Sequence, residues 1–283
     1  MVILVTGANG QLGQSLRAEA AAYFGAHELV FCSSADLDIT NADSVQAAFA
    51  QYKPTYCINT AAYTAVDKAE SEPEKAHLIN VEGPALLAKA CAEWNTTLLH
   101  ISTDFVFDGT QSTPYKETDL PNPTGVYGQT KLDGEQQIQA IWDKHYIVRT
   151  AWVYSEFGNN FMKTMLRLAQ ERPFLTVVND QMGTPTHARN LAAALFQMIQ
   201  KDGTFAEHPY GVYHYSQEGQ CSWFDFACEI LQVNRFQTPV KPLKTVDFPT
   251  PAQRPAYSVL DKSKIKSVFG LGIKGWEESL QSR

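Results

Sequence analysis

The chain has 283 residues, of which 44% are hydrophobic and 19% are charged, and this composition is that of an ordinary globular protein with a sizeable core. It excludes general disorder, and no run approaches the ~18 apolar residues that a membrane-spanning helix needs. With 23 basic and 30 acidic residues, the formal net charge is −7. This balance argues against nucleic acid as a partner, because basic surfaces neutralise phosphate backbones.

The cysteines and the N-terminus indicate a reducing compartment. Five cysteines are scattered without a C-x-x-C pair, namely Cys32, Cys57, Cys91, Cys221 and Cys228. Their odd number and their scatter argue against a disulfide framework or a zinc site, and Cys32 and Cys57, which lie within apolar runs, are predicted to be reduced core residues. Residues 1–6 lead directly into glycines, without the basic region and apolar stretch of a secretory signal. We expect a cytoplasmic protein.

Short apolar or β-branched segments alternate with longer segments of helical period up to about residue 150. Strands are predicted at 2–6, 28–32, 57–60, 98–102 and 146–149, and helices at 11–23, 42–51, 76–94 and 127–142. The strands are nearly continuous in apolar character, as in sheets covered on both faces. We therefore expect an α/β fold with a Rossmann-like, doubly wound parallel sheet.

Several residues predict where helices begin. Thr40 or Asn41 is predicted to cap the second helix, and residues 71–74 to form a capping box with an early proline before the third. Beyond residue 150, helices are predicted at 160–170, 187–200 and 222–231 with Ser222 as cap, and strands at 175–179 and 212–215. Five of the 14 prolines lie within 238–257, which predicts an extended crossing segment.

A glycine-rich turn follows the first predicted strand and opens the first predicted helix. Gly7, Gly10 and Gly13 are spaced G-x-x-G-x-x-G, with Gln11 and Leu12 between the last two. Such glycines permit a tight turn, let backbone N–H groups approach a pyrophosphate, and let the helix pack close to the sheet. The helix N-terminus adds a partial positive charge. The turn predicts a dinucleotide-binding site.

The residues after the second predicted strand leave the choice between NADPH and NADH open. Ser33 and Ser34 stand where an NAD-specific site has an acidic residue, and no arginine replaces them to hold a 2′-phosphate. Their hydroxyls could serve either ribose, with a slight preference for NADPH. Asp38 and Ile39 could lie near the adenine, or Asp38 could be a turn residue before the second helix.

Tyr127 and Lys131 are four residues apart in a predicted helix, so their side chains lie on one face. A neighbouring ammonium lowers the pKa of a tyrosine from about 10 toward values useful in acid and base catalysis. Thr103 follows the fourth predicted strand, at the edge where such sheets bind ligands, and could hold a substrate carbonyl or cap a turn. With the glycine turn, these residues predict hydride transfer.

Sequence blocks along almost the whole chain resemble extended short-chain dehydrogenases/reductases and, among them, the reductases of dTDP-linked 4-keto-6-deoxy sugars. The blocks are 6–13, 38–40, 59–67, Asn80, 102–109, 127–131, 149–154, 158–161, 178–186 and 254–255. The later blocks are the more specific ones, above all Asn179-Asp180-Gln181 followed by Gly183-Thr184-Pro185-Thr186.

The resemblance implies reduction of dTDP-4-dehydro-6-deoxy-L-mannose at C4 to dTDP-L-rhamnose by NADPH or NADH. Tyr127 would protonate the C4 oxygen, Lys131 would lower the pKa of that tyrosine and hold the nicotinamide ribose, and Thr103 would polarise the carbonyl. Further implied contacts are Asp104, Trp152 and Asn160 with the sugar, Arg254 with the pyrophosphate, and Ala61, Ala62 and Tyr63 with the cofactor. Trp152 could instead be a core residue and Arg254 half of a surface ion pair.

Two domains are expected. Residues 1–155 would bind the dinucleotide, with a return of the chain near 183–215, and residues 156–182 and 216–283 would form a smaller C-terminal α/β substrate-binding domain. Some members of the family dimerise through a metal held by acidic residues, one of them two positions after the third glycine. Ser15 occupies that position, so we expect no metal, and a monomer or a homodimer.

Other functions compete with this one. An epimerase or dehydratase of the same superfamily would return the hydride, but such dehydratases have Thr-Asp-Glu after the strand, and here Phe105 occupies the third position. A cofactor-binding regulatory subunit is a second alternative, against which the intact Thr103, Tyr127 and Lys131 argue. Reduction of another 4-keto nucleotide sugar is a third.

Overall fold

Six parallel strands form the central sheet of the computed structural model, which describes residues 1–25 and 28–281. Their order is β10-β5-β4-β3-β1-β2, and every neighbouring pair is parallel. The strands are β1 (Ile3–Thr6), β2 (Leu29–Cys32), β3 (Tyr56–Asn59), β4 (Thr97–Thr103), β5 (His145–Thr150) and β10 (Gly211–His214). The predicted doubly wound sheet is confirmed, and its strands begin and end within one residue of their predicted bounds.

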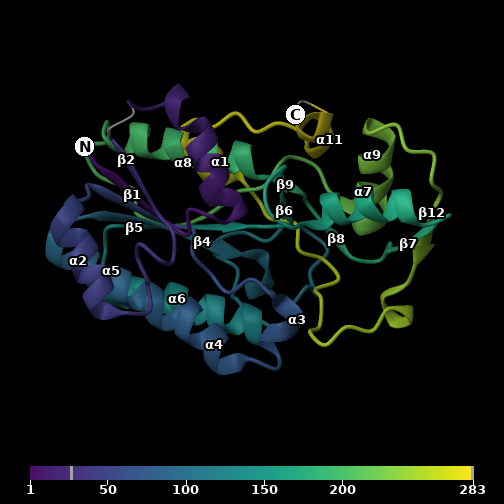
Figure 1. The fold of residues 1–283 in the computed structure, drawn as a ribbon, viewed down its shortest axis with the longest axis horizontal. Helices are drawn as coiled ribbons and strands as arrows, with labels where there is room; N and C mark the ends of the chain where they lie inside the picture. Colours follow the sequence, from purple (N-terminus) through teal and green to yellow (C-terminus); the bar gives the residue numbers. More distant parts are fainter. Residues whose placement is uncertain (26–27, 282–283) are drawn as a thin grey trace.

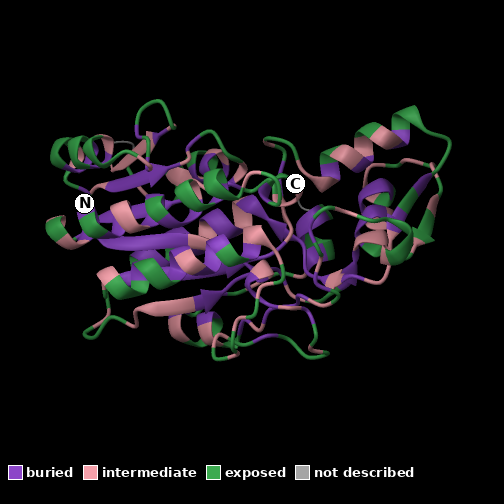
Figure 2. Ribbon diagram, turned by 90° about the horizontal axis from the view of Figure 1, so that it is seen from below, coloured by how far each residue is buried: buried purple, intermediate pink, exposed green. Residues whose placement is uncertain are grey.

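Helices cover both faces of this sheet (Figure 1). One face carries α1 (Gln11–Glu19), α8 (Ala188–Asp202) and α10 (Ser263–Phe269), and the other carries α2 (Ala42–Tyr52), α5 (Gly83–Trp94) and α6 (Val126–Ile141). Ile3 belongs to the apolar cluster on the first face and Leu4 to the cluster on the second, because successive strand residues point to opposite faces. The four inner strands are therefore buried and the edge strands β2 and β10 partly so, while the outer surfaces of the helices are exposed (Figure 2).

The helical segment between β3 and β4 is broken into pieces. It consists of α3 (Val66–Ala69), α4 (Pro73–His77), a π-helical turn (Leu78–Glu82) and α5. The capping box predicted at 71–74 is wrong, because the Ser71 hydroxyl donates instead to the carbonyl of Lys68. Pro84 lacks the N–H that would bond the carbonyl of Asn80, so the wider turn forms just before it. At the second predicted helix, Asn41 is the cap.

A smaller layer lies beside the sheet (Figure 1). There, α7 (Phe161–Glu171), α9 (Trp223–Val233) and the paired strands β7 (Leu175–Val178) and β12 (Val240–Leu243) surround a third apolar cluster. Two short pairs, β6 (Val153–Tyr154) with β9 (Thr186–His187) and β8 (Met182–Gly183) with β11 (Cys221–Ser222), precede α11 (Trp276–Gln281) along the chain. Ser222 caps α9 in a capping box, as expected.

The five cysteines are free, and four of them are buried. Within 1–25 and 28–281, we find no helix that is both long enough and apolar enough to cross a membrane.

Candidate active site

A cavity of about 700 Å³ opens at the carboxyl edge of the sheet, beside the reversal of strand order between β1 and β3. Doubly wound sheets bind their ligands at such a reversal. The wall includes residues of α7 and α9, so both layers contribute to it. Eleven of the residues predicted from the sequence line the cavity: Gly10, Gln11, Leu12, Ala62, Thr103, Asp104, Tyr127, Lys131, Trp152, Asn160 and Arg254.

Six other predicted residues lie outside this lining: Gly7, Gly13, Asp38, Ile39, Ala61 and Tyr63. The Asp38 carboxylate accepts hydrogen bonds from the N–H and hydroxyl of Thr40, so it stabilises its own turn. Ile39 is buried in the core, and the Tyr63 hydroxyl donates to Glu72. A direct cofactor contact by these side chains stays a prediction.

The glycine turn has the shape that a pyrophosphate-binding loop requires. Gly7 has a φ of +69°, in the left-handed region that favours glycine, and a Cβ on it would lie 2.6 Å from the Ala61 nitrogen. A Cβ on Gly13 would lie 2.5 Å from the Gly7 carbonyl oxygen, so α1 approaches the turn only because no side chain is present. The N-terminus of α1 reaches the cavity at Gly10 and Gln11, where its N–H groups can bind an anion.

The Thr103 hydroxyl lies between two groups of the cavity that can carry a proton, the Asp104 carboxyl and the Tyr127 phenol. It donates to Asp104 Oδ1 at 3.1 Å, accepts from the N–H of Phe105 at 3.2 Å, and faces the Tyr127 hydroxyl. Burial raises the pKa of Tyr127 to about 12, although the Thr103 hydroxyl acts in the opposite direction. Burial also raises the pKa of the Asp104 carboxyl to about 6. Both groups therefore hold their protons more strongly than they would in water.

Lys131 is buried on the same helix face as Tyr127. Its Nζ donates to the carbonyl of Ile101 at 2.7 Å and lies 3.1 Å from Nε2 of His100. Burial lowers the pKa of the Lys131 ammonium to about 8. The expectation that this lysine leaves Tyr127 with a lowered pKa is contradicted, because burial of the phenolate dominates.

Trp223 lines the cavity and was missed by the sequence analysis. It is the first residue of α9, directly after the cap Ser222, and stacks on Trp152. The only sequence signal was an aromatic residue at a predicted helix start, which by itself does not indicate a ligand site.

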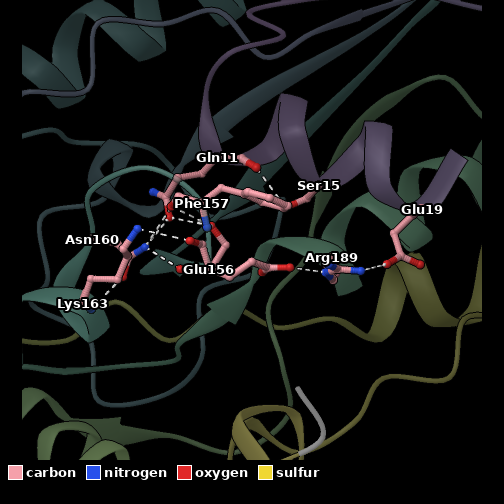
Figure 3. Close-up of polar contacts among 9 residues, drawn as sticks. Gln11, Ser15, Glu19, Glu156, Phe157, Asn160, Lys163 and Arg189 are labelled. Atoms are coloured by element: carbon pink, nitrogen blue, oxygen red, sulfur yellow. Dashed lines mark hydrogen bonds and ion pairs between the residues drawn. The ribbon is translucent and has the colours of Figure 1, made fainter. Parts of the chain in front are cut away.

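Gln11 is connected to the segment that precedes α7 (Figure 3). Its Oε1 accepts hydrogen bonds from Asn160 Nδ2 at 2.9 Å and from the Ser155 hydroxyl at 3.1 Å. Asn160 also donates to the carbonyls of Ser155 and Phe157, while its Oδ1 accepts from the Lys163 N–H and so caps α7. The Asn160 amide, expected at the sugar, thus holds the cavity wall to the glycine turn.

A second connection runs from the other end of α1. Arg189 pairs with Glu19 of α1 and with Glu156 of the segment that precedes α7 (Figure 3).

Ser15 occupies the position at which some family members have an acidic metal ligand. Its hydroxyl donates to the carbonyl of Gln11. Across the described ranges, no three His, Cys, Asp or Glu side chains form a group suited to a metal ion.

Arg254 reaches the cavity from the extended segment 238–257, whose predicted extended character is confirmed apart from one short helical turn at 245–247. Its Nη2 donates to Asp67 Oδ2 at 2.8 Å. Partial burial works against the charge of Asp67, but hydrogen bonds from Arg254 and Ala252 leave the pKa of this carboxyl below its usual value. Arg254 is therefore both half of an ion pair and part of the cavity wall.

Ser33, directly after β2, donates hydrogen bonds to the carboxylate of Asp36. Its N–H and its hydroxyl donate to Asp36 Oδ2 at 2.9 and 2.7 Å, and these bonds lower the pKa of Asp36. The sequence analysis did not identify Asp36, which places a negative charge beside the position considered for the ribose.

The dinucleotide turn and the group formed by Thr103, Tyr127 and Lys131 share one cavity on a doubly wound sheet. This combination defines a nicotinamide-dependent oxidoreductase of the short-chain dehydrogenase/reductase class.

Comparisons with known proteins narrow the class. The family model described as the RmlD substrate binding domain matches residues 1–283. A dTDP-4-dehydrorhamnose reductase of Aggregatibacter actinomycetemcomitans is 43% identical over 286 residues, covering 99% of this chain and 97% of that protein. The crystal structure of such a reductase from Clostridium acetobutylicum is 42% identical, with a TM-score of 0.93 over 99% of this chain and 97% of that one. The crystal structure of a dTDP-4-dehydrorhamnose reductase from Bacillus anthracis, in complex with NADP, is 38% identical. Its TM-score is 0.93, and the match covers 99% of this chain and 98% of that one. The chain belongs to the RmlD family.

Proposed function

We propose that this protein reduces the C4 keto group of dTDP-4-dehydro-6-deoxy-L-mannose to give dTDP-L-rhamnose. The observation that carries the proposal is the placement of the Tyr127 and Thr103 hydroxyls in one cavity with the N-terminus of α1. Relatives at 38–43% identity are dTDP-4-dehydrorhamnose reductases, and their identity extends over nearly the full chain.

The coenzyme proposed is NADPH, because a related structure holds NADP. Gly10, Gln11 and Leu12 would bind its pyrophosphate through the N-terminus of α1, and Ala62 and Lys131 would line its nicotinamide half. The bound coenzyme supplies the hydride that the keto carbon accepts. The residues 1–155 with 183–215 would serve as the coenzyme domain, and 156–182 with 216–283 as the sugar-nucleotide domain.

Tyr127 acts as the general acid for the keto oxygen. With a pKa of about 12, its hydroxyl carries a proton throughout the neutral range, as reduction requires of a proton donor. The Thr103 hydroxyl holds the same oxygen and stabilises the charge that develops on it. Lys131, which lines the same cavity, would hold the coenzyme ribose and set the electrostatic environment of the phenol.

The sugar nucleotide lies toward the smaller layer. Asp104 and Trp152 contact the sugar, and Arg254 binds a phosphate through guanidinium N–H groups that Asp67 does not use. Asn160 acts on the sugar side mainly by holding the wall to Gln11.

The proposed compartment is the cytoplasm, which free cysteines favour. All the groups named above come from one chain, so we propose that a single protomer is catalytically complete, whether it is monomeric or part of a homodimer.

The test is to mix the protein with NADPH and the dTDP-4-keto sugar and to follow the loss of reduced coenzyme. We expect turnover by the wild type and a loss of about 10²- to 10⁴-fold in Tyr127→Phe, with coenzyme binding retained. Tyr52→Phe, on α2 and away from the cavity, is the matched control. Near-normal turnover by Tyr127→Phe would overturn the proton donor. Coenzyme binding without consumption by the wild type would favour a regulatory subunit.

A further inference from the structure

Thr103 has a single hydroxyl hydrogen, and two neighbouring oxygen atoms face it. The Oγ1 atom lies 3.1 Å from Asp104 Oδ1 and also faces the Tyr127 hydroxyl. A hydroxyl group has one hydrogen and two lone pairs, and the N–H of Phe105 already occupies one lone pair at 3.2 Å. Thr103 is 5% exposed and Asp104 is 2% exposed, so little water reaches these contacts. The direction of one hydrogen therefore decides what Thr103 can do in the site.

The charge of Asp104 determines this direction in the protein without substrate. Burial raises the pKa of Asp104 only to about 6, so the group is a carboxylate at neutral pH, and a carboxylate can only accept hydrogen bonds. Thr103 therefore donates to Asp104 and presents its remaining lone pair to Tyr127. The Tyr127 hydroxyl, which keeps its proton in the neutral range, donates to that lone pair. Both hydrogens thus point along the line from Tyr127 through Thr103 to Asp104.

This direction is the opposite of the one that reduction requires. A keto oxygen only accepts hydrogen bonds, so Tyr127 and Thr103 must both turn their hydrogens toward it. Asp104 would then lose a donor while it stays charged and buried, which is unfavourable. Its other oxygen, Oδ2, has no hydrogen-bond partner within residues 1–25 and 28–281, although the Ser258 hydroxyl faces the carboxyl group. Asp104 therefore needs a new donor when the keto oxygen binds.

The proposed substrate itself carries such a donor. In a 4-keto-6-deoxy sugar, C3 is bonded to the keto carbon and carries a hydroxyl, whereas C5, on the other side, carries the methyl group. Oxygen atoms on adjacent ring carbons are separated by about one hydrogen-bond length. Thr103 Oγ1 and Asp104 Oδ1 have a similar separation, 3.1 Å. The keto oxygen can therefore approach Thr103 while the C3 hydroxyl approaches Asp104.

We propose that Asp104 is a specificity-determining residue that recognises the hydroxyl next to the keto group, and that this hydroxyl, by donating to Asp104, frees the Thr103 hydrogen for the keto oxygen. This assignment rests on the proposed function and extends it, because it states which sugar hydroxyl is recognised and what its binding does. No covalent bond changes in the step, and only hydrogen bonds exchange partners. A ketone without that hydroxyl leaves Thr103 donating to Asp104, so the keto oxygen has one donor instead of two.

The arrangement before substrate binds can be tested on the protein alone. Neutron diffraction from crystals at a pH well above the Asp104 pKa of about 6 locates the hydroxyl deuterium atoms. We expect the Thr103 deuterium to point at Asp104 Oδ1 and the Tyr127 deuterium to point at Thr103 Oγ1. A Thr103 deuterium that points at Tyr127 or into the cavity would overturn the proposal, whatever the protein reduces.

Two substrate analogues test the role of the hydroxyl with the wild-type protein and NADPH. The 3-deoxy form of the dTDP-4-keto sugar lacks the hydroxyl next to the keto group, and the 2-deoxy form, which lacks the next one, is the matched control. We expect kcat to fall about 10²-fold for the 3-deoxy form, the effect of losing one donor to the developing charge, and less than about threefold for the 2-deoxy form. Equal kcat values for the natural and 3-deoxy substrates would overturn the proposal.

Asp104→Leu should change the 3-deoxy result in the opposite direction. Without the carboxylate, the Thr103 hydrogen is free for the keto oxygen whether or not the sugar has a C3 hydroxyl. We expect the variant to reduce the 3-deoxy analogue with a higher kcat than the wild type, and the effect of the hydroxyl on kcat to shrink to within about fivefold. The intrinsic reactivities of the two ketones cancel, because both proteins are given the same pair. An undiminished hydroxyl effect in Asp104→Leu would contradict the proposal.

Variants of Thr103 show whether the hydroxyl effect passes through its hydrogen. Thr103→Ser keeps a hydroxyl and should keep the wild-type difference in kcat between the natural and 3-deoxy substrates. Thr103→Val has no hydrogen to release, so the C3 hydroxyl should affect KM alone. If the wild type reduces the dTDP-4-keto sugar but none of these differences appears, the role of Asp104 is wrong and the proposed function stands. If the wild type reduces no dTDP-4-keto sugar, the proposed function is wrong, and the role of Asp104 falls with it.

Discussion

Trp152 and Trp223 stack face to face, with ring centroids 3.6 Å apart and an interplanar angle of 10°. Trp152 has a φ of +47°, a backbone conformation that costs a bulky residue about 1–3 kcal/mol. A Cβ on Gly183 would lie 2.5 Å from the Trp152 ring, so the indole is held between this glycine and Trp223. The stack fixes an aromatic wall at the junction of the two layers, and the surrounding packing offsets the backbone strain.

Trp223→Ala should release Trp152 from this position. We expect the KM for the sugar nucleotide to rise about tenfold, while the affinity for the coenzyme stays within about twofold, since aromatic pairs contribute about 0.5–1.5 kcal/mol beyond buried area. Steady-state kinetics and coenzyme titration measure the two effects. Trp223→Phe, which keeps an aromatic face, should recover most of the loss. An unchanged KM in Trp223→Ala would show that the stack does not shape the sugar site.

Asn160→Asp should show whether Asn160 acts by holding the cavity wall to Gln11 or by contacting the sugar. The carboxylate can still accept from Lys163 and cap α7, but it cannot donate to Gln11 Oε1. We expect a loss of about 1–3 kcal/mol in the free energy of unfolding and weaker coenzyme binding, because Gln11 Oε1 and the carbonyls of Ser155 and Phe157 lose the Asn160 donor and face a carboxylate oxygen instead. Gln232→Glu, at an exposed position of α9 outside the cavity lining, makes the same charge change and is the control. Wild-type stability with only a higher sugar KM would instead make Asn160 a sugar ligand.

Asp104→Asn should stabilise the fold while weakening the site. The folded pKa of about 6 lies above the unfolded value of about 3.9, so the native state binds more protons between these values and stability falls as pH rises through about 4 to 6. Both states are ionised at pH 7, and the full cost, about 2–3 kcal/mol, remains there. Urea denaturation of both proteins from about pH 4 to pH 7 should show that Asp104→Asn loses this dependence and gains stability at neutral pH. A difference in unfolding free energy between the two proteins that stays constant over this pH range would contradict the prediction.

Asp36→Ala should change coenzyme preference. The carboxylate at the end of β2 repels a 2′-phosphate, and its removal should raise kcat/KM for NADPH relative to NADH about two- to fivefold, the range for an exposed charge pair. The ratio should approach that of the wild type at high salt, because exposed charges are screened. Glu28→Ala, which removes a half-buried carboxylate directly before β2, is the control. An unchanged ratio would place the 2′-phosphate away from Asp36.

Local signals predicted the elements well because they act within one strand or helix. Apolar runs marked the strands of the sheet, and the spacing from Tyr127 to Lys131 marked the face of α6 that lines the cavity. The capping box at 71–74 failed because Ser71 closes the preceding turn instead. Asp38 and Ile39 were predicted near the adenine, with a turn as the alternative for Asp38; the Asp38 side chain does stabilise a turn and Ile39 is in the core, while contact with the adenine stays a prediction.

The sequence by itself determined the order of strands and helices and the position of the glycine turn, and it supplied the hydroxyl and amine groups proposed for hydride transfer, because these depend on backbone periodicity and residue type. Only the tertiary structure decided which groups meet across the chain: Trp152 with Trp223, Gln11 with Asn160, and Asn59 with His100 and Lys131. It also reversed the expected direction of the Tyr127 pKa. The physical reason is that desolvation and hydrogen-bond polarity depend on what surrounds a group in space, and neighbours in space are distant in the sequence.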